Sequence, residues 1–419
     1  MTATRLLVQK YGGSSVKDPS RIAAVAARIA RDRAAGKEVV AVVSAMGDTT
    51  DDLLALAATV SGGRLPDARE LDALLATGEN QAAALLATAL IANDVPAISL
   101  SGAQAGISAD GTFGKGRIAG IEPRRVRDEI AAGRVVIVAG FQGVSGGSET
   151  TTLGRGGSDT TAVALAAALG ADRCQIYTDV TGVYTADPRI VADARWLGVV
   201  GYEEMLELAN QGAQVMQTRA VELGWVNGVT IEVRSSYEEH PGTLIKEDSS
   251  VEQRNKVRGL AVDKGVAKVT MVAVPDRPGI ARAVFDPLAA SGANVDMIVQ
   301  NVSHDGTTDL SFTMSRTDLA AARAQLEQVR AAIGARALEI DESVAKVSIV
   351  GAGIQNAPGY AARMFGTLAD NAVNIQMIST SEIRITCIVA EGDADRALKA
   401  LHAAFDLATP DPIDEGARR

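Results

Sequence analysis

Short apolar runs alternate with longer amphipathic stretches over the first 245 residues. Residues 39–43 read Val-Val-Ala-Val-Val, an uninterrupted apolar run typical of a strand buried on both faces of a sheet. Asp18-Pro19 has the form of a helix start, and one helical face follows it at Ile22, Val25, Ala26 and Ile29. Further strands are expected at 6–8, 97–100, 135–139, 174–178 and 230–233, and helices at 82–91 and 160–169. This alternation predicts an α/β domain around a largely parallel sheet.

The pattern changes after residue 245. A polar, charged stretch over 246–264 is typical of a linker, and an internal repeat follows it. The segment 278–298 recurs 80 residues later as 358–378, with Pro, Gly, Ala, Phe, Leu, Asn, Met and Ile at equivalent places. Strands at 268–274 and 346–350 precede the two copies, so each is expected to be a ferredoxin-like βαββαβ module. The predicted domains are 1–245, a linker at 246–264, and modules at 265–340 and 341–419.

Charge and composition exclude several classes of protein. The chain has 41 basic and 51 acidic residues, a formal net charge of −10, which disfavours broad binding to nucleic acid or to an anionic membrane. Two cysteines form no disulfide framework, and three histidines leave little for a metal cluster. Cys174, His240, His304 and His402 are therefore interpreted as structural. No signal peptide or membrane span is expected, and a cytoplasmic location follows.

Glycine-rich segments lie where predicted strands end or helices begin. Gly12-Gly13 follows the first strand, and the segment 153–159 precedes a predicted helix. Glycine allows close approach of the backbone to a ligand, and amides at a helix start favour an anion such as phosphate. Tight turns without a ligand are the alternative. Lys10, Arg155 and Asp159 add charge beside these segments, at the strand ends where ligands collect in open α/β sheets. No Walker A pattern is present, so a P-loop fold is not expected.

A set of motifs in one order carries a family resemblance. They are Lys10-Tyr11-Gly12-Gly13-Ser14-Ser15, Ser44-Ala45-Met46-Gly47 with Thr49-Thr50-Asp51, Thr77-Gly78-Glu79, Leu153-Gly154-Arg155-Gly156-Gly157-Ser158-Asp159, and Thr178-Asp179-Val180-Thr181-Gly182-Val183-Tyr184 through Asp187-Pro188-Arg189. With these motifs the chain resembles the aspartokinases of the amino-acid kinase family. The two repeats resemble paired ACT domains. The resemblance runs from about residue 5 to residue 405.

The resemblance implies an amino-acid-kinase-like α/β sandwich followed by two ACT modules, and an activity. That activity is phosphorylation of the side-chain carboxylate of L-aspartate by ATP with Mg²⁺, the first step toward lysine, threonine, methionine and isoleucine. It makes Lys10 and Asp159 catalytic and assigns aspartate to Thr49, Glu79, Arg155 and Ser158. It assigns ATP to Lys10, Tyr11, Gly12, Gly13, Ser44, Thr178, Asp179, Tyr184 and Arg189. No protein metal site is implied beyond the nucleotide-bound Mg²⁺.

A zwitterionic diacid fits such a site on chemical grounds. It needs an anion for its amine, cations for its carboxylates, and a firm grip that positions the attacking oxygen. No activated serine or cysteine is required, because a carboxylate is already ionised at neutral pH.

The resemblance also implies regulation by amino acids at the repeats. Lysine, threonine or both are the expected effectors, and the modules are expected to join copies of the chain, in a homo-oligomer or with a shorter chain. The effector residues it implies are Asp276, Asn294, Asp296 and Gln300 in the first copy and Asn374, Ile375 and Ser381 in the second. A purely structural dimerisation surface is the alternative.

Other interpretations stay open. The substrate could be another acidic amino acid such as glutamate, or the chain could be an amino-acid sensor without kinase activity. Gln214 keeps the second alternative open, because family members commonly carry a lysine there; Arg219 could compensate. Single residues also have structural alternatives: Glu79 could begin a helix over 80–91, Asp159 could cap a helix, Thr178-Asp179 could form a turn, and Tyr184 could fill the core.

Overall fold

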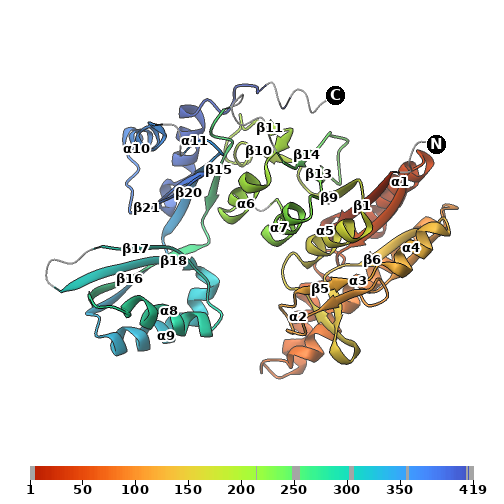
Figure 1. The fold of residues 1–419 in the computed structure, drawn as a ribbon, viewed down its shortest axis with the longest axis horizontal. Coiled ribbons are helices and arrows are strands. Elements are labelled where there is room, and N and C mark those ends of the chain that lie inside the picture. Colours follow the sequence, from red (N-terminus) through yellow and green to blue (C-terminus); the bar gives the residue numbers. More distant parts are fainter. Residues whose placement is uncertain are drawn as a thin grey trace.

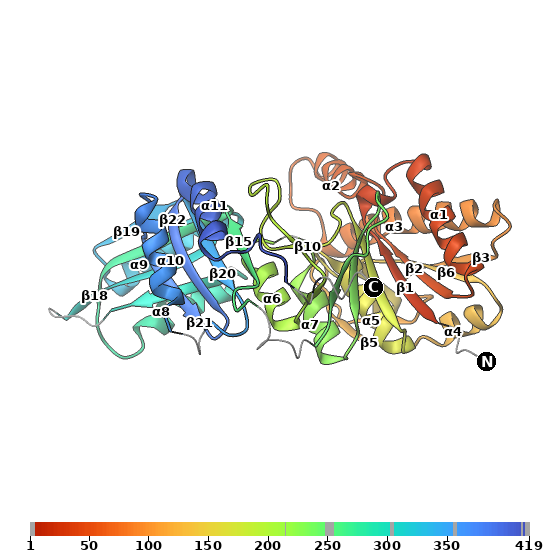
Figure 2. The ribbon, with the colours of Figure 1, turned by 90° about the horizontal axis from the view of Figure 1, so that it is seen from above.

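The computed structural model describes residues 5–213, 215–247, 255–301, 306–354, 358–411 and Asp414. Figures 1 and 2 show a large α/β part built from the first half of the chain and, at the other end of the molecule, two smaller sheets with their helices. Helices α6 (Tyr202–Asn210) and α7 (Thr218–Val226) lie between the two parts.

The large part is built on an eight-stranded sheet. Its strand order is β12 (Val199–Val200), β14 (Thr243–Ile245), β13 (Ile231–Ser235), β9 (Arg173–Thr178), β1 (Leu6–Tyr11), β2 (Glu38–Val43), β6 (Val135–Ala139) and β3 (Ala97–Leu100). The strands from β13 to β3 run parallel, and β14 is antiparallel to β13. The chain leaves β1 toward β2 on one side and reaches β9 on the other. Strand β1 therefore marks the switch point where such sheets bind ligands.

Helices cover both faces of this sheet. One face carries α1 (Pro19–Ala34) and α3 (Ala68–Ile91), and α2 (Thr49–Val60) packs on α3. The other face carries α4 (Arg124–Ala131), α5 (Gly157–Leu169), α6 and α7. In β2, Val39, Ala41 and Val43 join the first core, while Val40 and Val42 join the second. The uninterrupted apolar run thus supplies both faces, as the sequence predicted.

The predicted local elements are largely confirmed. Asp18 caps α1 and accepts a hydrogen bond from Arg21 N, with Pro19 as the first helical residue. Helix α3 is the main difference, because it begins at Ala68 and not at the expected residue 82. Asp67 caps it by accepting from the amides of Arg69 and Glu70.

Smaller sheets and turns complete the α/β part. Strands β5 (Ile118–Ile121), β4 (Ile107–Ala109), β7 (Gln142–Ser145) and β8 (Glu149–Thr152) form a four-stranded sheet, and β10 (Val183–Tyr184) pairs with β11 (Trp196–Leu197). Short 3₁₀ turns occur at η1 (Gly13–Ser15) and η2 (Gly146–Ser148). The β7–β8 hairpin leads directly into the glycine-rich segment before α5.

Helix α3 has the length and apolar composition of a membrane span, the one such helix in the described part of the chain. Half of that stretch is buried inside the protein, and Asp72 and Glu79 lie within the helix, both buried. Its apolar face packs against α1 and the sheet. We therefore interpret α3 as a core helix.

The two repeats form two antiparallel four-stranded sheets. The first has the order β17 (Val295–Gln300), β18 (Thr307–Ser315), β16 (Val266–Pro275), β19 (Ala337–Asp341), with α8 (Ile280–Ala290) and α9 (Arg316–Ile333). The second has the order β15 (Gly259–Asp263), β20 (Val344–Val350), β22 (Arg384–Ala390), β21 (Met377–Ser381), with α10 (Tyr360–Asp370), η3 (Glu391–Asp393) and α11 (Ala394–Ala404).

The second repeat differs from the prediction in its chain order. Its outer strand is β15, which comes before the first repeat and pairs antiparallel with β20. The expected linker over 246–264 is therefore wrong for residues 259–263, which are a strand. The reason is that β15 covers the exposed edge of β20, the place that β19 takes beside β16 in the first repeat.

Candidate functional site

Lys10 and Asp159 form an ion pair at the carboxyl end of β1. Strand alternation points Lys10 toward the face covered by α5, because its neighbours in register, Val42 and Ile176, belong to the core on that face. Asp159 lies in the first turn of α5, and its Oδ1 is 2.7 Å from Lys10 Nζ. Both side chains are largely buried, so this pair is screened less than a surface pair.

The glycine turn after β1 lies directly beside this lysine. A Cβ on Gly12 would lie 3.3 Å from Lys10 Nζ, and one on Gly13 would lie 3.0 Å from Ala45 O. Gly47 N donates to Gly13 O, so the turn also packs against the segment after β2. Glycine is needed here because two loops and the lysine side chain approach one another closely.

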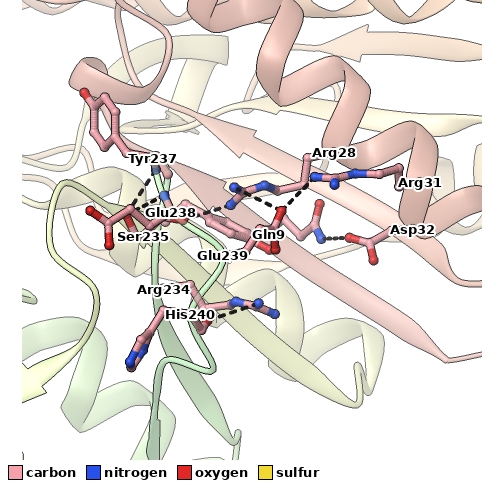
Figure 3. Close-up of polar contacts among 12 residues, drawn as sticks. Gln9, Arg28, Arg31, Asp32, Arg234, Ser235, Tyr237, Glu238, Glu239 and His240 are labelled. Atoms are coloured by element: carbon pink, nitrogen blue, oxygen red, sulfur yellow. Dashed lines mark hydrogen bonds and ion pairs between the residues drawn. The ribbon is translucent and has the colours of Figure 1, made fainter. Parts of the chain in front are cut away.

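Polar contacts with α1 and the segment after β13 hold this turn in place. Ser15 Oγ lies 2.5 Å from Ser236 Oγ, and Tyr237 Oη donates to Ser14 O. Figure 3 shows arginines of α1 reaching the same segment: Arg28 donates to Ser235 O, and Arg31 pairs with Glu239. These contacts tie the turn to the segment after β13, and that segment to α1.

Tyr11 differs from its predicted role. As the neighbour of Lys10 on a strand, it points to the opposite face, where its ring is fully buried and stacks on Tyr177 at 4.8 Å. Its hydroxyl donates to Gln9 Oε1, and burial raises its pKa well above the ordinary value. Only the main chain of Tyr11 can therefore line a nucleotide pocket.

Glu79 is a buried carboxylate in the middle of α3. Its side chain is 3% exposed, and its Oε1 accepts a hydrogen bond from Ala45 N at 3.0 Å. The other oxygen, Oε2, is buried with no hydrogen-bond partner among the described residues. Burial raises the pKa of Glu79 from 4.5 to about 7, and the bond from Ala45 offsets part of the rise. The helix-start alternative is wrong, because α3 begins eleven residues earlier.

Thr49 begins α2 and lies close to Gly78, the residue before Glu79. Its Oγ1 donates to Met46 O at 2.6 Å. A Cβ on Gly78 would lie 2.9 Å from Ala45 Cβ and 3.4 Å from Thr49 Cγ2. The missing side chain at Gly78 thus lets α3 approach Ala45 and Thr49 at the residue before Glu79.

Arg155 lies in the segment before α5, and Ser158 lies in the first turn of that helix. Gly154 and Gly156 have φ of 71° and 70°, values that favour glycine, and Arg155 stands between them with an exposed side chain. Ser158 is buried, and its Oγ would lie 2.8 Å from a Cβ on Gly140. Gly140 N donates to Val43 O, so this segment meets the end of β2, next to Ser44.

The expected nucleotide residues follow β9. Thr178 Oγ1 donates to Asp179 Oδ1, and Tyr184 Oη lies 2.6 Å from Thr181 Oγ1. Arg189 has an 88% exposed side chain whose guanidinium bonds Asp187 through two nitrogens. These hydrogen bonds raise the pKa of Arg189 and lower that of Asp187. The segment lies at the same sheet edge as Lys10, because β9 and β1 are parallel neighbours.

The predicted site residues of the α/β part therefore share one edge of the sheet. Lys10, Gly12, Gly13, Ser44, Thr49, Glu79, Gly140 and Ser158 are joined by the contacts given above. Among the described residues, no group of three or more His, Cys, Asp and Glu side chains could hold a metal ion. Gln214 lies outside the described residues.

The expected effector residues of the first repeat lie at two ends of its sheet within one chain. Asp276 and Gln300 lie at one end, since Pro275 pairs with Thr307 and Gln300 with Leu310. Asn294 and Asp296 lie at the other end, where Val295 pairs with Met314. Asp296 pairs there with Lys346 of the second repeat at 2.8 Å.

A polar cavity of about 370 Å³ lies at this second end. It is bounded by α6, β15 and both repeats, and it includes Asn294, Asp296, Lys346, Glu207 and Arg384. In the second repeat, Asn374 and Ile375 precede β21, while Ser381 ends it beside Arg384. The structure thus brings Asn294 and Asp296 together but separates them from Asp276 and Gln300.

Sequence reasoning missed Asp72 and did not foresee the contacts that Arg219 and His402 make near the site. Asp72 is buried and accepts a hydrogen bond from Thr152 at the end of β8. Arg219 donates to Leu153 O and Gly116 O, so its guanidinium is bonded to the glycine-rich segment. His402 of α11 contacts Thr185, next to Tyr184, with Nε2 2.9 Å from Oγ1. Burial lowers the pKa of His402. An isolated Asp, Arg or His carries no local signal of such long-range contacts.

Comparison with known proteins agrees with this geometry. A model of the amino acid kinase family matches residues 5–235, and ACT-domain models match residues 268–331 and 347–405. The aspartokinase of Pseudomonas aeruginosa is 49% identical over 407 residues, covering 97% of this chain and 98% of the relative. The aspartokinase of Mycolicibacterium smegmatis is 49% identical over 412 residues, covering 97% of each chain. The chain belongs to the aspartokinases of the amino acid kinase family.

Solved aspartokinase structures share the fold over nearly the whole chain. E. coli aspartokinase III in complex with aspartate and ADP, in its R-state, is 26% identical with a TM-score of 0.81, over 95% of this chain and 99% of that one. The same enzyme with lysine and aspartate, in its T-state, gives a TM-score of 0.76 over 96% and 99%. The predicted fold class, a largely parallel α/β domain followed by antiparallel ACT sheets, is confirmed.

Proposed function

We propose that this aspartokinase transfers the γ-phosphoryl group of ATP to the side-chain carboxylate of L-aspartate, giving 4-phospho-L-aspartate and ADP. The observation that carries the proposal is the pairing of two features at one sheet edge. Lys10, held by Asp159, stands at a glycine turn, and Glu79 offers nearby a buried oxygen that has no hydrogen-bond partner in the described part of the chain. A cation at a close-approach turn suits a phosphoryl group, and a buried anion suits an ammonium.

Each group has a role that follows from its charge and place. Lys10 stabilises the negative charge that spreads over the transferring phosphoryl group, and Asp159 holds its ammonium in position. Glu79 takes the aspartate ammonium, while Thr49 fixes the orientation of the substrate. Arg155 takes a carboxylate through its planar guanidinium, and Ser158 adds a hydroxyl. The aspartate side-chain oxygen then attacks the γ-phosphorus as the bond to ADP breaks.

The nucleotide lies across the ends of β1 and β9 in this proposal. The main chain from Tyr11 to Gly13 lines the phosphates, together with Ser44. The segment from Thr178 to Arg189 binds the remainder of the nucleotide. Bound Mg²⁺ would supply further positive charge to the phosphates. The Asp159 carboxylate, beside Lys10, would be the residue to hold it, since Mg²⁺ prefers oxygen ligands and few protein ligands when phosphates are present.

Replacing Lys10 by Ala tests the catalytic assignment. We expect turnover to fall about a hundredfold or more, because one transition-state contact is lost. The variant is expected to stay folded at the assay temperature but to unfold at a lower temperature than the parent, because the largely buried Asp159 loses its ion-pair partner. The assay measures ADP release with L-aspartate, with L-glutamate as the competing substrate. Near-normal turnover of the variant would refute the role of Lys10. A preference of the parent enzyme for L-glutamate would mean that glutamate, and not aspartate, is the substrate. Absence of ATP binding in calorimetry would favour a sensor.

Regulation by lysine, threonine or both belongs to the same proposal. The lysine complex of E. coli aspartokinase III supports it, as do the two ACT units of this chain. We expect inhibition of the purified enzyme by at least one of these amino acids, through Asp276, Asn294, Asp296 and Gln300 or Asn374, Ile375 and Ser381. Rates that stay unchanged with each amino acid and with their mixture would reject regulation. Cytoplasmic location and pairing of ACT units between chains, with a second copy or a shorter chain, complete the proposal.

A further inference from the structure

We propose that Asp72 and Arg219 are positioning residues that clamp the segment before α5 from two sides and so place Arg155 for substrate. Neither residue belongs to the motifs that define the expected site. The inference rests on the proposed function of Arg155 in binding a carboxylate of aspartate. It adds a determinant of aspartate affinity that acts through the backbone.

Asp72 holds the donors on one side of this segment. Its carboxylate accepts hydrogen bonds from Thr152 N at 2.8 Å, Thr152 Oγ1 at 2.6 Å and Gly114 N at 2.9 Å. The side chain is 1% exposed, so these are buried, charge-assisted bonds, about twice as strong as neutral ones. Gly116 N donates in turn to Thr152 O. The end of β8 is thereby fixed to the loop at Gly114–Gly116.

Arg219 holds the acceptors on the other side. From the first turn of α7, it donates to Leu153 O at 2.8 Å and to Gly116 O at 3.2 Å. Gln217, the cap of α7, packs on Gly156 so closely that a Cβ there would lie 1.8 Å from Gln217 Cγ. The segment that carries Arg155 is therefore bounded by an anion beneath Thr152, a cation at Leu153 and a side chain over Gly156.

Asp72 and Glu79 sit on the same face of one helix. Seven residues separate them, which is about two turns of α3. Gln142 Nε2 donates to Ala76 O between them, which ties this stretch of α3 to β7. One rigid element thus sets the position of the group proposed for the ammonium and, through Thr152, of the loop proposed for a carboxylate.

Arg155 itself depends on this backbone. Its side chain is exposed, and among the described residues no hydrogen bond or ion pair holds its guanidinium. Its direction in the free enzyme therefore comes from the dihedral angles of its own segment, with positive φ at Gly154 and Gly156. Loosening the segment costs substrate affinity before it costs chemistry.

The test compares Asp72→Asn and Arg219→Gln with Asp67→Asn in the full chain. Asp67 caps the same helix from an exposed position, and Asn caps equally well, so this control leaves kinetics unchanged. We expect each test variant to raise the KM for aspartate about tenfold or more, as one charge-assisted bond is lost, with the KM for ATP within about twofold. Asp72→Glu restores part of the affinity.

Combination with Arg155→Ala decides whether the effect passes through Arg155. Addition of either substitution to that variant is expected to raise the KM for aspartate little further, because positioning matters only when Arg155 is present. Fully additive effects, or equal increases in both KM values, would overturn the inference. If Asp72→Asn fails to fold, Arg219→Gln decides alone. A normal KM in both clamp variants with a raised KM in Arg155→Ala overturns only this inference, whereas a normal KM in Arg155→Ala overturns the role of Arg155 and the inference with it.

Discussion

At the scale of single residues, burial of the Glu79 carboxylate lowers the free energy of unfolding at neutral pH. Burial in α3 raises its pKa from 4.5 to about 7, so the folded protein holds a proton on it that the unfolded chain releases. A group with a raised carboxyl pKa lowers the free energy of unfolding as pH rises through that interval. An ammonium group bound at Oε2 would favour ionised Glu79 and lower its pKa again.

Glu79→Gln separates these two effects. We expect the variant to be more stable than the parent at pH 8, by at most about 3 kcal/mol, since 2.5 pKa units are removed. Below about pH 4.5 the difference disappears, because Glu79 is then protonated in both states. Urea unfolding at both values of pH measures this. A variant that is less stable at pH 8 would contradict the burial argument.

The pH dependence of the KM for aspartate should show the pKa of Glu79. Only ionised Glu79 pairs with an ammonium, so the KM for aspartate is expected to rise as pH falls below about 7. In Glu79→Gln the KM is expected to increase about thirtyfold or more at pH 8 and to lose this pH dependence, because a buried charge pair has lost one partner. A KM that is flat between pH 6 and pH 8 in the parent would show that Glu79 does not bind the amine.

At the scale of elements, the glycines inside α3 and α10 have opposite packing environments. A helix-interior glycine is ordinarily about 1 kcal/mol less favourable than alanine. In α10, Gly366 has open space where a Cβ would lie. In α3, a Cβ on Gly78 would lie 2.9 Å from Ala45 Cβ. The second glycine is thus required by the approach of α3 to the loop after β2.

The pair Gly78→Ala and Gly366→Ala tests this reading. We expect Gly366→Ala to stabilise the protein by about 0.5–1 kcal/mol through lower entropy of the unfolded chain. Gly78→Ala is expected to destabilise it by about 1–3 kcal/mol, as overpacking does, and to raise the KM for aspartate. Denaturant unfolding and steady-state kinetics measure both. Stabilisation by Gly78→Ala with unchanged kinetics would mean that the loop yields without consequence.

At the scale of the whole molecule, several contacts join the α/β part to the second ACT unit. His402 contacts Thr185, and Leu260 of β15 donates its amide to Thr185 O, so the ACT unit touches the proposed nucleotide segment. Ala186 and Val191 of that segment belong to the apolar core of the ACT unit. Asp414 reaches back to pair with the buried Arg258 and with Arg195. Movement of this ACT unit would therefore displace Thr185, the residue next to Tyr184.

Asp414→Ala tests the strength of the connection made by Asp414. Arg258 is 1% exposed at its side chain and Asp414 6%, so removal of the Asp414 carboxylate leaves the buried guanidinium with Asp411, at 3.6 Å, in place of the 2.6 Å pair. We expect a loss of about 3–5 kcal/mol in the free energy of unfolding. Asp286→Ala, which removes an exposed pair with Arg282, is the control and should cost less than about 1 kcal/mol. Equal effects in the two variants would show that the Asp414 cluster is not a structural connection.

Much of this fold could be predicted from neighbouring residues alone. The cap at Asp18, the buried face of α1 and strands β3 and β6 follow from spacing and side-chain type, and the structure confirms them. The ordered motifs also predicted the family, through their resemblance to those of aspartokinases, and the comparisons confirm it. Placement of Lys10 and Asp159 on one face likewise follows from strand alternation and a helix start.

Contacts between distant segments were decided only by the tertiary structure. The outer strand of the second ACT sheet comes from β15, and Asp72 reaches Thr152 across 80 positions of sequence. Glu79 became a mid-helix carboxylate, and Asn294 was separated from Asp276 by the length of a strand. Periodicity reports which face a residue occupies, since that depends on its neighbours in the chain. It carries no information about which remote partner covers that face, since that depends on packing of the whole molecule.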